Sequence, residues 1–112
     1  MPAMKLPIAA LLLIVATAAA LAQTHPCAAD AIAKATPLLR LHYGDPKEPV
    51  DVDNSVKVLP TIKALKGNGR FDVLEVLGHI YKATYRMRFI YAQIKGSCVL
   101  MGQEILEASN PY

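Results

Sequence analysis

The first regular pattern of hydrophobic and polar positions in the chain has the period of an α-helix. It runs from Cys27 to Tyr43, where inward-facing positions recur at steps of three and four residues. These positions are Ala28, Ile32, Ala35, Leu39 and His42. Pro37 cannot donate to the carbonyl four residues earlier, so we expect the helix to kink near Pro37 or to restart there with Thr36 as its cap. Gly44 is expected to end the helix.

The period changes to two after residue 55, which predicts β-strands. Before this change, the acidic, proline-containing segment from Asp45 to Asn54 has the composition of an exposed loop. Four strand-like segments then follow, separated by turn signals such as Lys66-Gly67-Asn68-Gly69; they are Val56 to Ala64, Arg70 to Tyr81, Tyr85 to Ile94 and Cys98 to Leu106. Pro60 places the first strand at an edge of its sheet. The order predicts an α+β domain in which one N-terminal helix packs on a four-stranded antiparallel meander.

Two short turns determine the expected register of this sheet. With two-residue turns at Ala83-Thr84 and Lys95-Gly96, Phe89 lies between Gly78 and Gly102 of the neighbouring strands. The two glycines then leave a shallow patch where the helix approaches. Because side chains alternate along a strand, the helix-covered face also takes Leu74, Val76, Ile80, Tyr85, Met87, Tyr91, Cys98, Leu100 and Leu106.

The opposite face of the predicted sheet combines apolar and charged residues. It takes Glu75, Leu77, His79 and Tyr81 from one strand, Arg86, Arg88 and Ile90 from the next, and Val99, Met101, Gln103 and Ile105 from the last. This is more apolar area than a solvated sheet face usually exposes. We therefore expect a protein partner to bind this face, with contact residues Glu75, His79, Tyr81, Arg86 and Arg88.

Residues 1–22 have the three parts of a cleavable secretory signal peptide. One cation precedes the apolar run from Leu6 to Ala20, and a small-residue exit site follows at Ala20-Leu21-Ala22. Cleavage would leave Gln23 as the first residue of one small domain, residues 23–112. No cationic stop signal follows the apolar run. We therefore expect a periplasmic or secreted protein with no stable membrane anchor after cleavage.

The charge balance gives little support for a nucleic-acid partner. Without the one cation of the leader, the twelve Lys and Arg become eleven, against nine Asp and Glu. Such a small excess does not favour a polyanion. Basic and aromatic residues interleave from Tyr81 to Phe89, as they do in a stacking platform. The rings of Tyr85, Phe89 and Tyr91 belong to the helix-covered face, however, so we expect no nucleic acid to bind.

The chain contains two cysteines, Cys27 and Cys98. In an exported protein such a pair favours a disulfide. The bond would close a loop of about 70 residues and stabilise the fold by about 4 kcal/mol in the chain-entropy model. A domain of this size has a small core, so a covalent link would add substantially to its stability. The alternatives are two free buried thiols, or a pair that binds one metal ion.

Residues with catalytic potential form no recognisable constellation. The serines lie in no nucleophile motif, and we expect no cofactor. His79 and Glu75 share a strand face, and they support either acid–base chemistry or a plain cross-strand ladder of ion pairs. His42 is interpreted as a boundary residue of the helix.

Two segments resemble metal sites only in part. Asp51 and Asp53 match the start of a calcium-binding loop. Val56 and Ile62, however, occupy the positions that require glycine and glutamate. After cleavage, Gln23-Thr24-His25 would place a histidine third behind a free amine, a geometry that holds square-planar Cu(II) or Ni(II). An N-terminal glutamine cyclises readily and removes that amine, so we expect no metal site.

These observations favour a binding module over an enzyme. The order of one helix and four antiparallel strands is similar to that of cystatin-like and related small inhibitor folds. The cystatin inhibitory motif Gln-x-Val-x-Gly is absent, so no residue role is transferred from that family. We expect an exported, non-enzymatic binder, such as an inhibitor or an envelope accessory protein, that contacts a protein partner through its exposed sheet face. The alternatives are a small periplasmic metal or ligand carrier and, third, a hydrolase.

Overall fold

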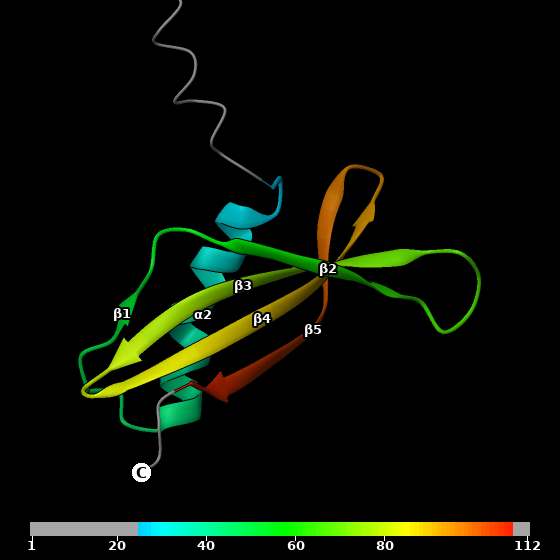
Figure 1. Ribbon diagram of the computed structural model, residues 1–112. Coiled ribbons are helices and arrows are strands. Elements are labelled where there is room, and N and C mark those ends of the chain that lie inside the picture. Colours follow the sequence, from blue (N-terminus) through cyan, green and yellow to red (C-terminus); the bar gives the residue numbers. More distant parts are fainter. Residues whose placement is uncertain (1–24, 109–112) are drawn as a thin grey trace, which may run out of the picture.

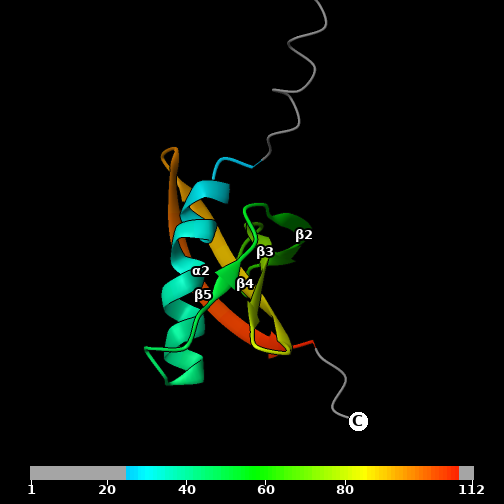
Figure 2. The same ribbon diagram turned by 90° about the vertical axis from the view of Figure 1, so that its left-hand side faces the viewer.

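A computed structural model describes residues 25–108, which form one helix packed on one antiparallel sheet (Figures 1 and 2). The elements in chain order are α2 (Ala28–Tyr43), β1 (Asp51–Val52), β2 (Lys57–Lys63), β3 (Arg70–Ile80), β4 (Ala83–Ile94) and β5 (Ser97–Glu107). The expected signal peptide lies outside the described residues. The predicted α+β class is confirmed.

The sheet is a meander whose first strand is divided in two. β3, β4 and β5 pair consecutively, and both β1 and β2 pair with the other edge of β3. We expected the segment from Asp45 to Asn54 to be entirely loop. Asp51 and Val52 of this segment instead pair with His79 and Gly78 and form β1. β2 is an edge strand, as Pro60 predicted, and its register shifts between Leu59 and Ile62.

α2 is one continuous helix that includes Pro37, so the expected restart at Pro37 is wrong. Gly44 ends it as predicted, with a φ of 87° and its N–H donated to the Arg40 carbonyl at 2.9 Å. The fully buried residues on the core side of the helix are Cys27, Ala31, Ala35 and Leu39. The prediction had Ala28 and Ile32 in place of Cys27 and Ala31, so it was wrong by one residue at the start of the helix. Among the described residues, no helical segment has the length and apolar content to span a membrane.

The core lies between α2 and one face of the sheet. The sheet supplies Leu74, Val76, Ile80, Tyr85, Met87, Phe89 and Tyr91, all less than a tenth exposed. The predicted disulfide between Cys27 and Cys98 is present, with 5.7 Å between the two Cα atoms. It joins the start of α2 to β5, two residues with a sequence separation of 71.

The turn between β3 and β4 is at Tyr81-Lys82, not at Ala83-Thr84. Gly78 therefore lies opposite Tyr85, and the expected pairing of Gly78 with Phe89 is wrong. The shift is an even number of residues, so the predicted faces of both strands are retained. Gly78 still allows the helix to approach, because a Cβ there would lie 2.6 Å from Leu39 Cδ2.

A β-bulge changes the faces of β5. Tyr91 pairs with Leu100 but Ile90 pairs with Gly102, which leaves Met101 as the extra residue. Beyond the bulge every side chain of β5 points to the face opposite to the predicted one. Ile105 packs on the core, whereas Leu106 is 43% exposed and faces away from α2, so both assignments were wrong. Gln103 moves likewise, since it pairs with the buried Phe89.

Candidate functional site

The sheet face turned away from α2, which we call the open face, carries one row of alternating charges. Cross-strand pairing places Lys57 of β2 beside Glu75, Glu75 beside Arg88, and Arg88 beside Glu104 of β5. Arg88 Nε donates to Glu75 Oε2 at 3.0 Å, and Arg88 Nη1 donates to Glu104 Oε1 at 3.3 Å. Of the predicted cross-strand ladder, the pair of Glu75 and Arg88 is present, whereas His79 and Arg86 do not take part in it. We call Lys57, Glu75, Arg88 and Glu104 the charge row.

Glu75 is the one charged residue in the described part of the chain that is buried, at 8% exposure. A carboxylate removed from water needs a compensating partner, and Arg88 provides it. The same contact raises the pKa of the Arg88 guanidinium, with the hydrogen bond to Glu75 as the main cause. Arg88 is thus held in one position by two carboxylates rather than left free on the surface.

His79 is not paired with Glu75. The two residues are four positions apart on β3, roughly 13 Å along an extended strand, which is too far for a side-chain contact. His79 Nε2 instead lies 3.1 Å from Asp53 Oδ1, and Nδ1 lies 3.3 Å from Thr84 Oγ1. The Thr84 hydroxyl is farther from the imidazole than a nucleophile normally is from its base. The contacts connect the β1–β2 segment to the end of β3, and they engage His79 with Asp53 and Thr84 rather than with Glu75.

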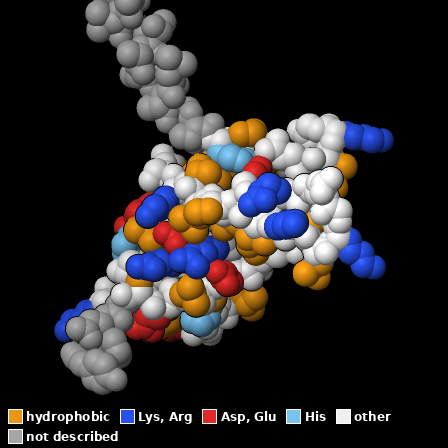
Figure 3. All heavy atoms as spheres, turned by 45° about the vertical axis from the view of Figure 1, so that its right-hand side comes forward, with side chains coloured by type: hydrophobic (Ala, Val, Ile, Leu, Met, Phe, Trp, Pro, Cys, Tyr) orange, Lys and Arg blue, Asp and Glu red, His pale blue; other side chains and the backbone are white. Residues whose placement is uncertain are grey.

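Beside the charge row lies an apolar row with a groove above it. Leu59, Val73, Ile90 and Gly102 are cross-strand neighbours, and Gly102 contributes no side chain to cover Ile90. The groove has a volume of about 420 Å³ and is lined by Leu59, Pro60, Ile62, Val73, Arg88, Ile90 and Glu104. Figure 3 shows hydrophobic, basic and acidic side chains gathered together on this side of the molecule.

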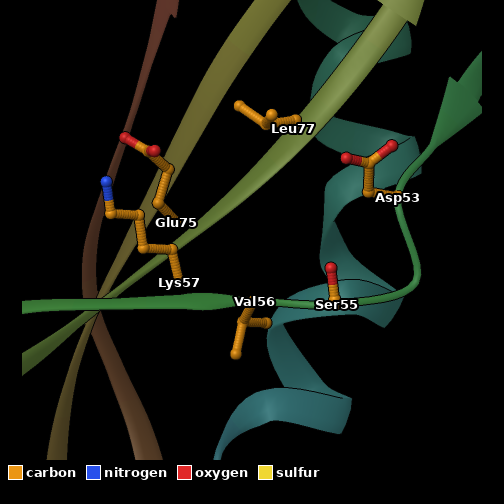
Figure 4. Close-up of a pocket in the computed structure, with 6 residues that line it drawn as sticks. All are labelled: Asp53, Ser55, Val56, Lys57, Glu75 and Leu77. Carbon is orange, nitrogen blue, oxygen red and sulfur yellow. The ribbon is translucent and has the colours of Figure 1, made fainter.

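A smaller cavity lies on the other side of the charge row. It has a volume of about 130 Å³ and is lined by Asp53, Ser55, Val56, Lys57, Glu75 and Leu77. Figure 4 shows the Lys57 and Glu75 side chains close together, with Leu77 between Glu75 and the Asp53 carboxylate. Its size and polar walls suit a few water molecules better than an organic ligand.

The structure gathers four of the five predicted contact residues on the open face. Arg86 lies between Leu77 and Leu106, is exposed, and has no ion pair among residues 25–108. Tyr81 is the exception, because it occupies the β3–β4 turn with a φ of 54° and is 83% exposed. Its ring contacts Lys82, whose Nζ is 5.5 Å from the ring centroid.

No protein-family model, curated protein or solved structure matches this chain. The open face also includes residues that sequence reasoning did not select, namely Asp53, Leu59, Val73 and Glu104. Glu104 was missed because the bulge at Met101 had no signal in the pattern. Leu59 and Val73 were missed because they appear in the sequence as ordinary strand residues.

The N-terminal metal motif finds no support at His25. The backbone N–H of Cys27 donates to His25 Nδ1 at 3.0 Å, so the proton of the neutral ring is on Nε2, which lies 3.0 Å from Asp72 Oδ2. Both ring nitrogens are therefore engaged within the fold. Within residues 25–108, no group of three or more His, Cys, Asp or Glu side chains is arranged to hold a metal ion.

Proposed function

We propose that this chain is an exported, non-enzymatic binding module whose open face contacts a protein partner. The observation that carries the proposal is the apolar groove bordered by the charge row. Interfaces between proteins commonly have this composition, with an apolar centre and a polar rim. The disulfide between Cys27 and Cys98 supports export to a periplasmic or extracellular compartment, where such bonds persist.

The groove is suited to an anchoring side chain of the partner. Its floor is formed by Val73 and Ile90, and its border on the Arg88 side is held in place by the ion pairs with Glu75 and Glu104. A preformed border lowers the ordering cost of association. A branched or aromatic side chain of the partner would fill the groove, as anchor residues do at interface hot spots.

Arg86 is the residue of the open face that would select a partner by charge. It is exposed between the apolar side chains of Leu77 and Leu106, without a carboxylate partner among the described residues. A carboxylate of the partner would meet it there. Arginine among apolar side chains is a common hot-spot arrangement.

Filling the groove tests this proposal. Gly102→Leu adds a side chain next to Ile90 whose Cβ would meet Ile90 Cδ1 at 3.8 Å, an ordinary contact. We therefore expect this variant to keep the fold and to fill part of the groove. The partner is first isolated by site-specific photo-crosslinking from residue 90 in the exporting host. Its purified form should then bind Gly102→Leu at least tenfold more weakly than the unmodified protein. Gly69→Leu, in the β2–β3 hairpin at a position that does not line the groove, is the matched control. Equal affinities of the two variants would contradict the proposal.

A small-ligand carrier is the second candidate, because a volume of about 420 Å³ is within the range of small-molecule sites. Native mass spectrometry of the exported protein separates the two functions. A stoichiometric small molecule that is lost in Gly102→Leu would favour the carrier.

A further inference from the structure

Two hairpins project from the same end of the sheet. Asp72 pairs with Tyr91, and beyond this pair β3 and β4 separate, each continuing with its own partner strand. Figure 1 shows the β2–β3 and β4–β5 hairpins diverging from this point. His25, which contacts Asp72, is at the same end. We call this end of the molecule the hairpin end.

The β2–β3 hairpin is basic from Lys57 to Arg70 and has an exposed leucine at its tip. Between Asp53 and Asp72 the chain contains four cations and no acid; the cations are Lys57, Lys63, Lys66 and Arg70. Leu65 has a relative exposure of 102%, so its side chain touches almost nothing in the fold. The tip is an ordered turn, because the Ala64 N–H donates to the Gly69 carbonyl at 2.9 Å.

The β4–β5 hairpin repeats the combination of apolar and basic side chains. Ile94 is 51% exposed and precedes Lys95 in the turn, and Met101 of the bulge is 53% exposed. A fully exposed leucine between cations has no role in the core. Apolar side chains surrounded by Lys and Arg are instead the composition of segments that enter the interface of a lipid bilayer.

We propose that the hairpin end binds reversibly to a membrane surface that contains anionic lipids, independently of the open face. Leu65 enters the boundary between headgroups and acyl chains, and Lys63, Lys66 and Arg70 contact the lipid phosphates. Charge complementarity sets the orientation, because the other end of the sheet is acidic, with Asp45, Glu48, Asp51 and Asp53 near β1.

The place of His25, the first described residue, agrees with this orientation. The apolar run of the expected signal peptide ends a few residues before His25, and His25 is fixed to Asp72 at the hairpin end. During export, the hairpin end would therefore be the part of the domain next to the bilayer.

The experiment uses exported, oxidised protein and two vesicle compositions, phosphatidylcholine alone and phosphatidylcholine mixed with phosphatidylglycerol. The protein should sediment with the anionic vesicles and not with the neutral ones. Each cation near an anionic surface changes affinity by about fivefold, so Lys63→Gln/Lys66→Gln should bind about 25-fold more weakly. High salt should weaken binding in the same direction. The control Lys47→Gln/Lys82→Gln, at the acidic end, should bind like the unmodified protein.

Insertion of residue 65 is read out by fluorescence. The chain has no tryptophan, so Leu65→Trp places a single reporter at the tip, and its emission should shift to the blue with anionic vesicles. Leu41→Trp, at a position 79% exposed in the last turn of α2, is the matched control and should not shift. Absence of sedimentation, or equal shifts at both positions, would overturn the proposal. Loss of binding in the lysine variant without a shift at residue 65 would also overturn it, because the cations would then bind the lipid phosphates without insertion of residue 65.

Discussion

Glu75 and Arg88 face each other across β3 and β4, and Arg88 Nε donates to Glu75 Oε2 at 3.0 Å. One of these groups is buried and the other is partly exposed, with side-chain exposures of 9% and 28%. The pair therefore has two roles at once. It compensates a carboxylate inside the sheet, and it borders the groove proposed as the binding site.

Removal of one member of this pair should destabilise the fold more than removal of an unpaired neighbour. Arg88→Met leaves Glu75 without its compensating cation, and we expect the melting temperature to fall by at least about 5 °C. Arg86→Met removes an exposed cation on the same strand and should change it by less than about 2 °C. Thermal unfolding followed by circular dichroism measures both. If the two variants have the same melting temperature, burial of the Glu75 carboxylate does not depend on the cation of Arg88.

Gly78→Ala should be destabilising because the helix packs directly over Gly78. The added Cβ would lie 2.6 Å from Leu39 Cδ2 and 2.7 Å from Met87 Cε, and both side chains are fully buried. Overpacking of this kind costs about 1–3 kcal/mol of unfolding free energy. Denaturant unfolding measures it against Gly102→Ala, whose Cβ would meet no atom closer than 3.8 Å. An unchanged stability of Gly78→Ala would mean that the ends of the Leu39 and Met87 side chains move aside at little cost.

Reduction of the Cys27–Cys98 bond should cost about 4 kcal/mol, since it opens a long loop in the unfolded chain. The measurement compares denaturant midpoints with and without reductant. Cys27→Ser/Cys98→Ser should match the reduced protein to within about 1 kcal/mol. A double variant as stable as the oxidised protein would show that the closed loop contributes nothing to stability.

The hydrogen bond from Tyr91 to Asp30, at 2.6 Å, gives the protein a pH dependence at both extremes. Burial first and Asp30 second raise the pKa of Tyr91 above its ordinary value of 10.0. The folded state thus holds the phenolic proton more tightly than the unfolded state. The stability from this group is fully present below pH 10 and declines as the pH rises through the folded-state pKa.

Asp30 acts in the opposite direction, because hydrogen bonds from Lys34 first and Tyr91 second lower its pKa below 3.8. Its contribution is present above that value and is lost as the pH falls through the folded-state pKa. We expect Tyr91→Phe to flatten the alkaline decline and to weaken the acid one, whereas Tyr81→Phe, with an exposed ring, leaves both unchanged. Urea unfolding at a series of pH values tests this. A parallel alkaline decline in wild type and Tyr91→Phe would refute the assignment.

The sequence by itself determined the helix, the four longer strands and the residues of β3 and β4 that face the core. Helical and strand periods are local properties of the chain, so the helix ending at Gly44 and the edge position of Pro60 followed from them. The disulfide between Cys27 and Cys98 followed from the number of cysteines and the expected compartment.

The tertiary structure alone decided the register and, with it, which residues of β5 lie on the open face. Tyr81 adopts a left-handed backbone conformation that its side chain does not favour, so no local signal marked the turn. The bulge at Met101 allows Ile105 to pack on the core and places Glu104 beside Arg88. The position of the turn and that of the bulge both depend on packing between segments far apart in the chain, because a shift of one residue in pairing reverses which side chains are buried.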